Sequence, residues 1–199
     1  YIAKPFADHL KNTNDPRLGA IAVRYVGVKS GSEQTPAKAN IDPAMQNGMP
    51  LGFDNNGIVA EATKAGLASF YEFSQVDRTR MVKNTAPMFL VTAAQTQLLL
   101  AEAIQRGWAT GNIAQTYQKA VRLHMEQCAL YDARSAIAGS AIDAYLAANP
   151  FDASKALEQI NTQYWIASFL NGPEAFANFR RSGFPKLTTN PFPGKAIKG

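Results

Sequence analysis

Aromatic and polar side chains gather in one stretch of the first half of the chain, and they are the residues best suited to hold a ligand. Phe53, Asp54 and Asn55 lie in a turn-like run, and Tyr71 and Phe73 follow in a ring-rich segment. Flat rings suit the C–H faces of sugars, whereas amide and carboxylate oxygens suit hydroxyl groups. We therefore take these five residues as candidate ligand-binding residues. The alternative is that the rings attach the loop to the core, because aromatic side chains contribute strongly to burial.

Patterns for catalysis, metal binding and cofactor binding are missing or weak. The sequence holds no glycine-flanked serine elbow, phosphate-binding loop, dinucleotide fingerprint or His-Glu-x-x-His motif. The run from Asp54 to Gly57 is rich in oxygen ligands, but it lacks the alternation and the closing Glu of a calcium loop, so we expect a turn. His124 and Cys128 lie one helical turn apart, and we expect both to be buried on a helix. We predict no catalytic residue, no metal site and no cofactor.

Three carboxylates provide one weak argument for an enzymatic function. Glu61, Glu72 and Asp77 lie near aromatic residues, and glycoside hydrolysis needs a pair of carboxyl groups facing one cleft. With 15 acidic residues in the chain, such neighbours are expected by chance, and the sequence fixes no distance between them. A catalytic function is therefore not supported.

The composition narrows the class of protein. The chain has 199 residues, 46% of them hydrophobic, so it can bury a real core and is not a disordered chain. One Cys excludes a disulfide scaffold. No apolar run reaches the roughly 18 residues of a membrane-spanning helix. The net charge of +5 is scattered rather than gathered in a basic stripe, so we do not expect nucleic acid as a partner.

The first 85 residues are rich in turn-forming residues, holding 12 of the 25 Gly and Pro (14 Gly and 11 Pro). The only β-like run spans Ile21 to Val28, where a strand is expected. The stretch from Gly31 to Gly57 is expected to be a long surface loop, and loops of that length are often functional. Residues 1–85 are thus predicted to be a loop-rich section with a possible short strand.

From Ala86 onward the apolar spacing is that of helices. Pro87 fits the first turn of a helix, Arg106-Gly107 fits a helix end, and Asn112 fits a cap. The double arginine at 180–181 is expected to bind helix-end carbonyls, and the chain from Ser182 is expected to run extended. The expected helices run from Pro87 to Arg106, from Asn112 to Cys128, from Ser140 to Ala148, from Asp152 or Ser154 to Leu170, and from Glu174 to Arg181.

The spacing also assigns a buried side to each long helix. Thr92, Gln95 and Glu102 fall mainly on the outer side of the first helix, whereas Trp108 and Trp165 are expected in the core. The predicted fold is all-α: a tetratricopeptide-like helical hairpin with further C-terminal helices in residues 86–199, after the loop-rich section. The expected core positions are Leu90, Ala94, Leu98, Ala101 and Ile104, then Ile113, Tyr117, Ala120, Val121, His124 and Cys128, then Leu157, Ile160, Tyr164, Ala167 and Leu170.

Three ordered motifs carry a resemblance to a known family. The run from Leu157 to Gly172 with its continuation to Pro185, the segment from Pro87 to Trp108, and Asp15-Pro-Arg-Leu18 together resemble the SusD/RagB family. Two departures are Phe176, where relatives often carry Trp, and Ala94-Gln95, where they commonly show Ala-Glu. Both are expected to be packing variations. The resemblance covers most of the chain, which looks like the C-terminal portion of such a protein.

The resemblance implies a surface-exposed nutrient-binding lipoprotein of the outer membrane in Bacteroidetes-type bacteria. Such proteins capture oligosaccharides, or peptides in some branches, and deliver them to a SusC-like TonB-dependent transporter. The lipid anchor would lie outside this chain. No ligand residue of the family lies within the shared motifs, so the five candidates rest on residue type alone. The alternative function is a helical protein- or peptide-binding module of tetratricopeptide type, with Trp108 or Tyr117 in a concave groove.

Overall fold

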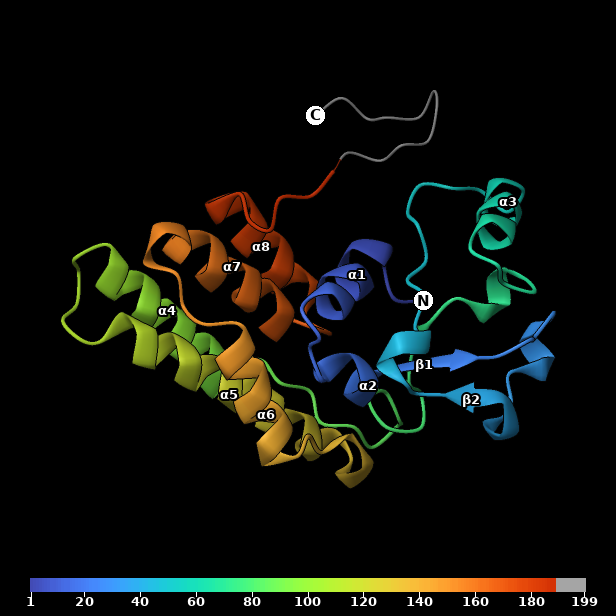
Figure 1. Cartoon of the computed structure of the whole chain (residues 1–199), viewed down its shortest axis with the longest axis horizontal. Coiled ribbons are helices and arrows are strands. Elements are labelled where there is room, and N and C mark those ends of the chain that lie inside the picture. Colours follow the sequence, from blue (N-terminus) through green and yellow to red (C-terminus); the bar gives the residue numbers. More distant parts are fainter. Residues whose placement is uncertain (189–199) are drawn as a thin grey trace. The chain divides into compact units, whose positions relative to one another are not determined.

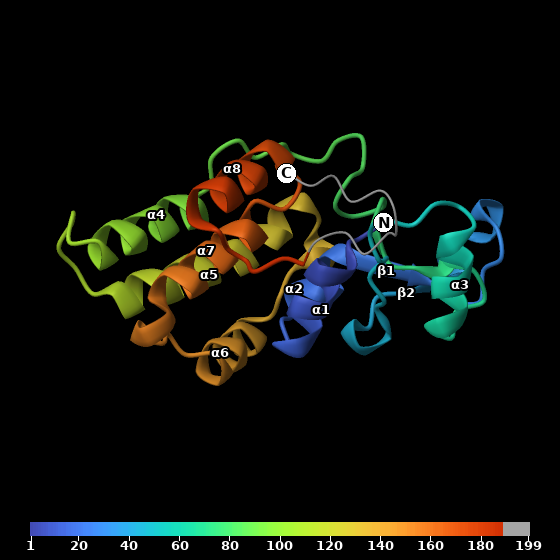
Figure 2. The same cartoon turned by 90° about the horizontal axis from the view of Figure 1, so that it is seen from above.

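The computed structural model describes residues 1–188 and divides into two compact units (Figures 1 and 2). The first unit comprises Tyr1–Thr85, and the second comprises Ala86–Leu187. The expected all-α fold class is confirmed, because helices dominate and the described strands are short. Each unit is described on its own.

The first unit combines three α-helices with a small antiparallel sheet. The sheet has the order β2-β1-β3, in which Arg24 pairs with Asn40 and Ala22 pairs with Val76. Short 3₁₀ turns fill the remaining connections. The elements are α1 (Lys4–Asn12), α2 (Arg17–Ile21), β1 (Ala22–Tyr25), η1 (Gly31–Glu33), η2 (Pro36–Lys38), β2 (Ala39–Asn40), η3 (Pro43–Met45), α3 (Gly57–Lys64), η4 (Phe70–Glu72) and β3 (Gln75–Val76).

The strand prediction is correct in place but too long. Ile21 ends α2, and the chain leaves β1 after Tyr25, with Gly27 at a φ of +71°. Between Gly31 and Gly57 the chain is a long irregular connection with only short elements, as expected. The helices α1 and α3 were not among the expected elements. Both bury a narrow apolar side, such as Phe6, Ala7 and Leu10 on α1.

Buried arginine–carboxylate pairs hold the first unit together. Arg17 and Asp15 are both almost fully buried, and the Arg17 guanidinium donates to both carboxylate oxygens. Arg24 on β1 donates to the Glu72 carboxylate and to the Met45 carbonyl. A buried charge is tolerated only when it is paired and hydrogen-bonded. These contacts therefore fix the sheet to the turns around it.

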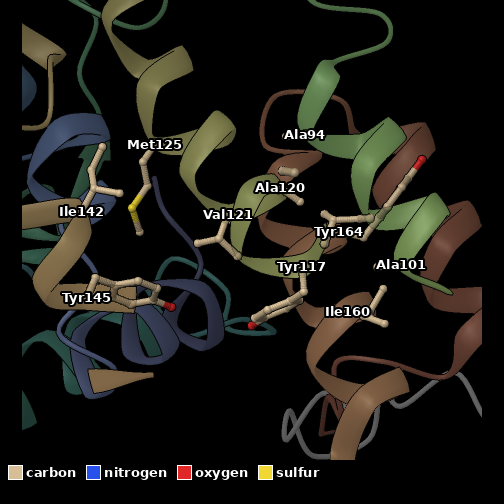
Figure 3. Close-up of a cluster of buried hydrophobic side chains, with 12 residues drawn as sticks. Ala94, Ala101, Tyr117, Ala120, Val121, Met125, Ile142, Tyr145, Ile160 and Tyr164 are labelled. Carbon is tan, nitrogen blue, oxygen red and sulfur yellow. The ribbon is translucent and has the colours of Figure 1, made fainter. Parts of the chain in front are cut away.

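The second unit is a layer of packed helices. Helix α4 packs against both α5 and α7, and α7 also packs against α8 (Figures 1 and 2). Tyr117, Val121 and Met125 of α5 meet side chains of α4, α6 and α7 in one apolar cluster (Figure 3). The elements are α4 (Ala93–Gln105), α5 (Ile113–Tyr131), η5 (Ala133–Ser135), α6 (Gly139–Ala148), η6 (Ala153–Lys155), α7 (Ala156–Ala167) and α8 (Gly172–Ser182).

The predicted start of the first of these helices is wrong. Helix α4 begins at Ala93, because Thr92 and Gln95 form a capping box in which each side chain accepts the other's backbone N–H. Pro87 therefore lies before the helix, and Leu90 is exposed rather than buried. Thr92, Gln95 and Glu102 were all expected on the outer side, and all three are buried.

The structure confirms other predictions for the second unit. Gly107 ends α4 at a φ of +73°, and the Asn112 side chain caps α5 by accepting the N–H of Gln115. The expected third, fourth and fifth helices correspond to α6, α7 and α8, and Asp152 caps the short turn η6 that precedes α7. Buried residues on the expected sides include Ala94, Leu98, Ala101, Tyr117, Ala120, Val121, His124, Cys128, Ile160, Tyr164 and Ala167.

Several residues at helix ends were placed wrongly. Trp108 is 76% exposed because it follows the α4 terminus, where the Arg106 guanidinium lies 5.3 Å from its ring. Leu170 is also exposed, with a left-handed φ of +67°. Ser182 is the last residue of α8 rather than part of an extended tail, and the tail prediction beyond Thr188 lies outside the described residues.

Arg181 does not bind helix-end carbonyls as expected. Its guanidinium donates to both carboxylate oxygens of Glu102, at 2.5 and 2.8 Å, and to the side-chain oxygens of Asn161 and Asn178. Glu102 also accepts from Arg106 at 2.9 Å. This Glu102 network joins α4, α7 and α8 through polar contacts beside the apolar cluster.

Candidate functional site

Two ring residues of the first unit form a partly exposed aromatic surface. The rings of Phe70 and Tyr71 stack with centroids 4.2 Å apart, and Tyr71 packs against the buried cluster of Val23, Tyr25 and Val28. Tyr71 is half-buried, so one part of its ring anchors the turn η4 and another part meets solvent. The Tyr71 ring therefore attaches the turn to the core and leaves part of its surface open to solvent.

Polar side chains are linked to the Tyr71 backbone. The Gln34 side chain donates to the Tyr71 carbonyl at 2.9 Å and accepts from Arg78 at 3.2 Å. Burial, together with the nearby Tyr71, raises the Tyr1 pKa above its ordinary value, and the Gln34 side chain opposes that shift. The Tyr1 phenol therefore stays protonated at neutral pH. We call Tyr1, Gln34, Tyr71 and Arg78 the tyrosine cluster.

The five candidate residues do not form one site. Phe53 packs against the apolar cluster that contains Phe73, and Asp54 and Asn55 are exposed beside it. The Asp54 carboxylate accepts the N–H groups of Asn56 and Gly57, which is the expected turn rather than a calcium loop. Phe73 is only 2% exposed, so the expectation that its face stacks on a ligand is wrong. Tyr71 is the one candidate in the tyrosine cluster.

A pocket of about 250 Å³ lies between α1 and α3. Lys4 and Asp8 line it from α1, and Glu61 and Lys64 line it from α3. Its remaining lining comes from Phe73, from Ala65, and from the connection that includes Asn47, Gly48 and Pro50. We call it the α1–α3 pocket. Of the five candidate residues, only Phe73 reaches it.

Backbone hydrogen bonds fix one wall of the α1–α3 pocket. The Met49 N–H donates to the Ile2 carbonyl and the Lys4 N–H donates to the Met49 carbonyl, both at 2.8 Å. A Cβ on Gly48 would lie 2.5 Å from the Lys4 Cα, so only glycine allows this approach. No short sequence motif predicts the pocket, because its lining comes from separate segments spread between Lys4 and Phe73.

The carboxylates weighed for glycoside hydrolysis have other partners. Burial raises the pKa of Glu72, but the Ala68 N–H and the Arg24 guanidinium outweigh it and lower that pKa overall. Burial likewise raises the pKa of Asp77, but hydrogen bonds, first of all from the Arg80 guanidinium, outweigh it. The pKa of Asp77 is therefore also lowered overall. A general acid needs a raised pKa, so neither group is suited to protonate a leaving sugar. Glu61 pairs with Lys64.

Comparison with known proteins decides the family. The sequence profile of the SusD-like family, described as starch-binding and associating with the outer membrane, matches residues 1–197. The chain belongs to the SusD-like family. No curated protein matches the chain.

Solved SusD-like structures share the fold. A chitin-binding protein matches with a TM-score of 0.76 and 29% identity over 94% of this chain and 38% of its own. A structure described as Bacteroidetes AC2a SusD-like matches with a TM-score of 0.73 and 25% identity, over 95% and 44%. A SusD homologue from Bacteroides fragilis NCTC 9343 matches with a TM-score of 0.71 and 26% identity, over 95% of this chain and 41% of its own. The chain spans about two fifths of the length of these relatives.

The segments that resemble SusD/RagB have structural roles in this SusD-like chain. Asp15 and Arg17 form a buried ion pair, and Glu102 and Arg181 join α4 to α8. Cys128 and His124 are buried on α5, where the thiol donates to the His124 carbonyl. Within residues 1–188, no helix is long and apolar enough to cross a membrane.

Proposed function

We propose that this SusD-like protein binds glycans at the outer membrane and releases them unchanged. The observation that carries the proposal is the family match over residues 1–197, with its description of starch binding and outer-membrane association. A solved relative described as a chitin-binding protein supports a carbohydrate ligand. The proposal includes what the resemblance implies: a SusC-like TonB-dependent transporter as partner, and attachment to the outer membrane by a lipid anchor.

The tyrosine cluster is the surface that we propose for the glycan. Its two tyrosine rings offer apolar area, while the Gln34 amide and the Arg78 guanidinium offer polar groups at its rim. Sugars present C–H faces and hydroxyl groups side by side, so they suit such a mixed surface. Asp54 and Asn55 are exposed and stay among the proposed ligand contacts.

Titration with oligosaccharides tests the proposal. We expect chitin or starch oligosaccharides to bind the chain saturably, and Tyr71→Ala to weaken that binding about tenfold because a stacking surface is lost. Phe176→Ala is the matched control, since Phe176 is a 62% exposed ring on α8 of the other unit. Unchanged affinity in Tyr71→Ala with an intact melting temperature would remove the tyrosine cluster from the proposal.

A catalytic function is tested separately. After prolonged incubation with the same oligosaccharides, we expect no new reducing ends, because the Glu72 and Asp77 carboxylates are held by arginines. Release of reducing sugar that tracks the protein through purification would contradict a purely binding function.

The structure gives little support to the alternative function of a peptide-binding groove. Tyr117 is 4% exposed and belongs to the apolar cluster, so it cannot line a groove. Trp108 is exposed at the end of α4. The family match over residues 1–197 is what favours the glycan proposal over this alternative.

A further inference from the structure

We propose that the α1–α3 pocket is a second carbohydrate subsite, which takes one uncharged sugar ring. The proposal deepens the glycan-binding function and rests on it. It uses residues that neither the family motifs nor the tyrosine cluster include: Lys4, Asp8, Gly48, Glu61, Lys64 and Phe73.

The charges around the pocket cancel. Lys4 donates to Asp8 at 2.6 Å along α1, and Lys64 donates to Glu61 along α3. Each helix therefore presents one ammonium and one carboxylate that are already paired. An anionic ligand would meet both carboxylates, and a cationic ligand would meet both ammonium groups, so neither gains a net attraction. The balance favours an uncharged ligand.

The paired groups keep spare hydrogen-bonding capacity. An ammonium has three donors and a carboxylate has about four acceptor positions, and each ion pair uses only one of them. Hydrogen bonds to charged groups are stronger than those between neutral groups. A ligand with several hydroxyl groups can therefore bond the four charged side chains without breaking either pair. Phe73 also lines the pocket but is only 2% exposed, so the proposed ligand contacts come from the four charged side chains.

The size of the pocket limits the ligand. Its volume of about 250 Å³ falls below the roughly 300–1,000 Å³ of pockets that enclose drug-sized ligands. A single sugar ring is the matching unit, and the rest of a chain would continue into solvent. The fixed wall at Gly48 and Met49 makes this pocket a preformed feature rather than a space that opens on binding.

Nuclear magnetic resonance titration of the 199-residue chain tests the subsite. The probes are glucose and N-acetylglucosamine, with glucuronate and glucosamine as charged counterparts. We expect either neutral sugar to shift the amide signals of Gly48, Lys64 and Ala65 saturably. A charged sugar that binds tenfold more tightly than both neutral ones would overturn the assignment of an uncharged ligand.

Two substitutions on one helix provide the blocking test. Ala65→Trp places a large ring at the pocket without touching the buried core, because Ala65 is an exposed lining residue at the end of α3. Ala60→Trp is the matched control, since Ala60 is exposed on the same helix and does not line the pocket. We expect Ala65→Trp to weaken monosaccharide binding at least tenfold and Ala60→Trp to leave it within twofold.

The outcomes separate the subsite from the proposed function. If oligosaccharides bind and respond to Tyr71→Ala, but neutral monosaccharides never shift the pocket amides, the subsite is wrong and glycan binding stands. If Ala65→Trp leaves the monosaccharide shifts unchanged, the sugar sits elsewhere and the subsite is again wrong. If no saccharide of any length binds, both proposals fall.

Discussion

At the scale of single residues, Glu102 shows how one buried carboxylate can organise three helices. Its side chain is 5% exposed and accepts from Arg181 on α8 and from Arg106 at the end of α4. Burial raises the pKa of Glu102, but the hydrogen bonds from Arg181 and Arg106 outweigh it, so the pKa is lowered overall. The carboxylate therefore belongs to the structure rather than to a ligand site.

Replacing Glu102 should destabilise the second unit. We expect Glu102→Gln to reduce the free energy of unfolding by about 1–2 kcal/mol at pH 7, because it removes charged hydrogen bonds whose Arg181 partner is 44% exposed and partly screened by water. Glu158→Gln, at an exposed position on α7, is the matched control. Urea denaturation of the three proteins measures the difference.

The Glu102 effect should depend on pH in a defined direction. Because the folded-state pKa is lowered, the carboxylate stabilises the fold above its unfolded pKa of about 4.3, and that stability is lost as the pH falls through the folded value. The difference in the free energy of unfolding between the wild-type protein and Glu102→Gln should therefore shrink as the pH falls from 5 to 3. A gap that is constant over this range would contradict the assigned role of the charge.

At the scale of elements, the capping box at Thr92 and Gln95 sets where α4 begins. The Thr92 hydroxyl accepts the Gln95 N–H at 3.1 Å, and the Gln95 side chain accepts the Thr92 N–H at 3.0 Å. We expect Thr92→Ala to cost about 1 kcal/mol in the free energy of unfolding, since a capping hydroxyl is lost. Thr92→Ser keeps the hydroxyl and should stay close to wild type. Equal losses in both variants would point to packing of the Thr92 methyl group instead.

The same elements show how far the sequence could predict the fold. Asn112 and Arg106-Gly107 were identified correctly because caps depend on local backbone chemistry. The start of α4 was misplaced because Pro87 and the capping box both signal a helix start, and only the structure shows which one acts. Helix α1 was missed because its buried side is only Phe6, Ala7 and Leu10.

The candidate site was harder to predict than the helices. Tyr71 was found from its ring, but Tyr1 and Gln34 lie far from it in the sequence, and no spacing links them to Arg78. Phe73 was misjudged because residue type alone does not separate an exposed ring from a buried one. The α1–α3 pocket could not be predicted at all, since long-range packing brings its walls together.

At the scale of the whole molecule, we propose that residues 1–85 and 86–199 act as separate domains. The two compact units, Tyr1–Thr85 and Ala86–Leu187, support this proposal. The first unit contains Glu72 and Asp77, whose pKa values are lowered although burial opposes the shift, because arginines and backbone N–H groups bind them. Among the described residues of the second unit, Glu102 is the buried carboxylate whose pKa is lowered although burial opposes the shift.

Acid should therefore weaken the first unit more than the second. Each lowered carboxylate stabilises the fold above its unfolded pKa, of about 3.9 for Asp and 4.3 for Glu, and that contribution disappears as the pH falls through the folded value. Two such groups lie in the first unit, so we expect it to unfold at a higher pH than the second.

The chain carries its own reporter for this experiment. Both tryptophans, Trp108 and Trp165, lie in the second unit, so fluorescence excited selectively at tryptophan follows that unit alone. The amide signals of β1, from Ala22 to Tyr25, follow the first unit. On titration from pH 7 to pH 2.5, the β1 signals should disappear before the fluorescence changes. Transitions that coincide would show that the units unfold cooperatively, and the proposal of separate domains would then be wrong.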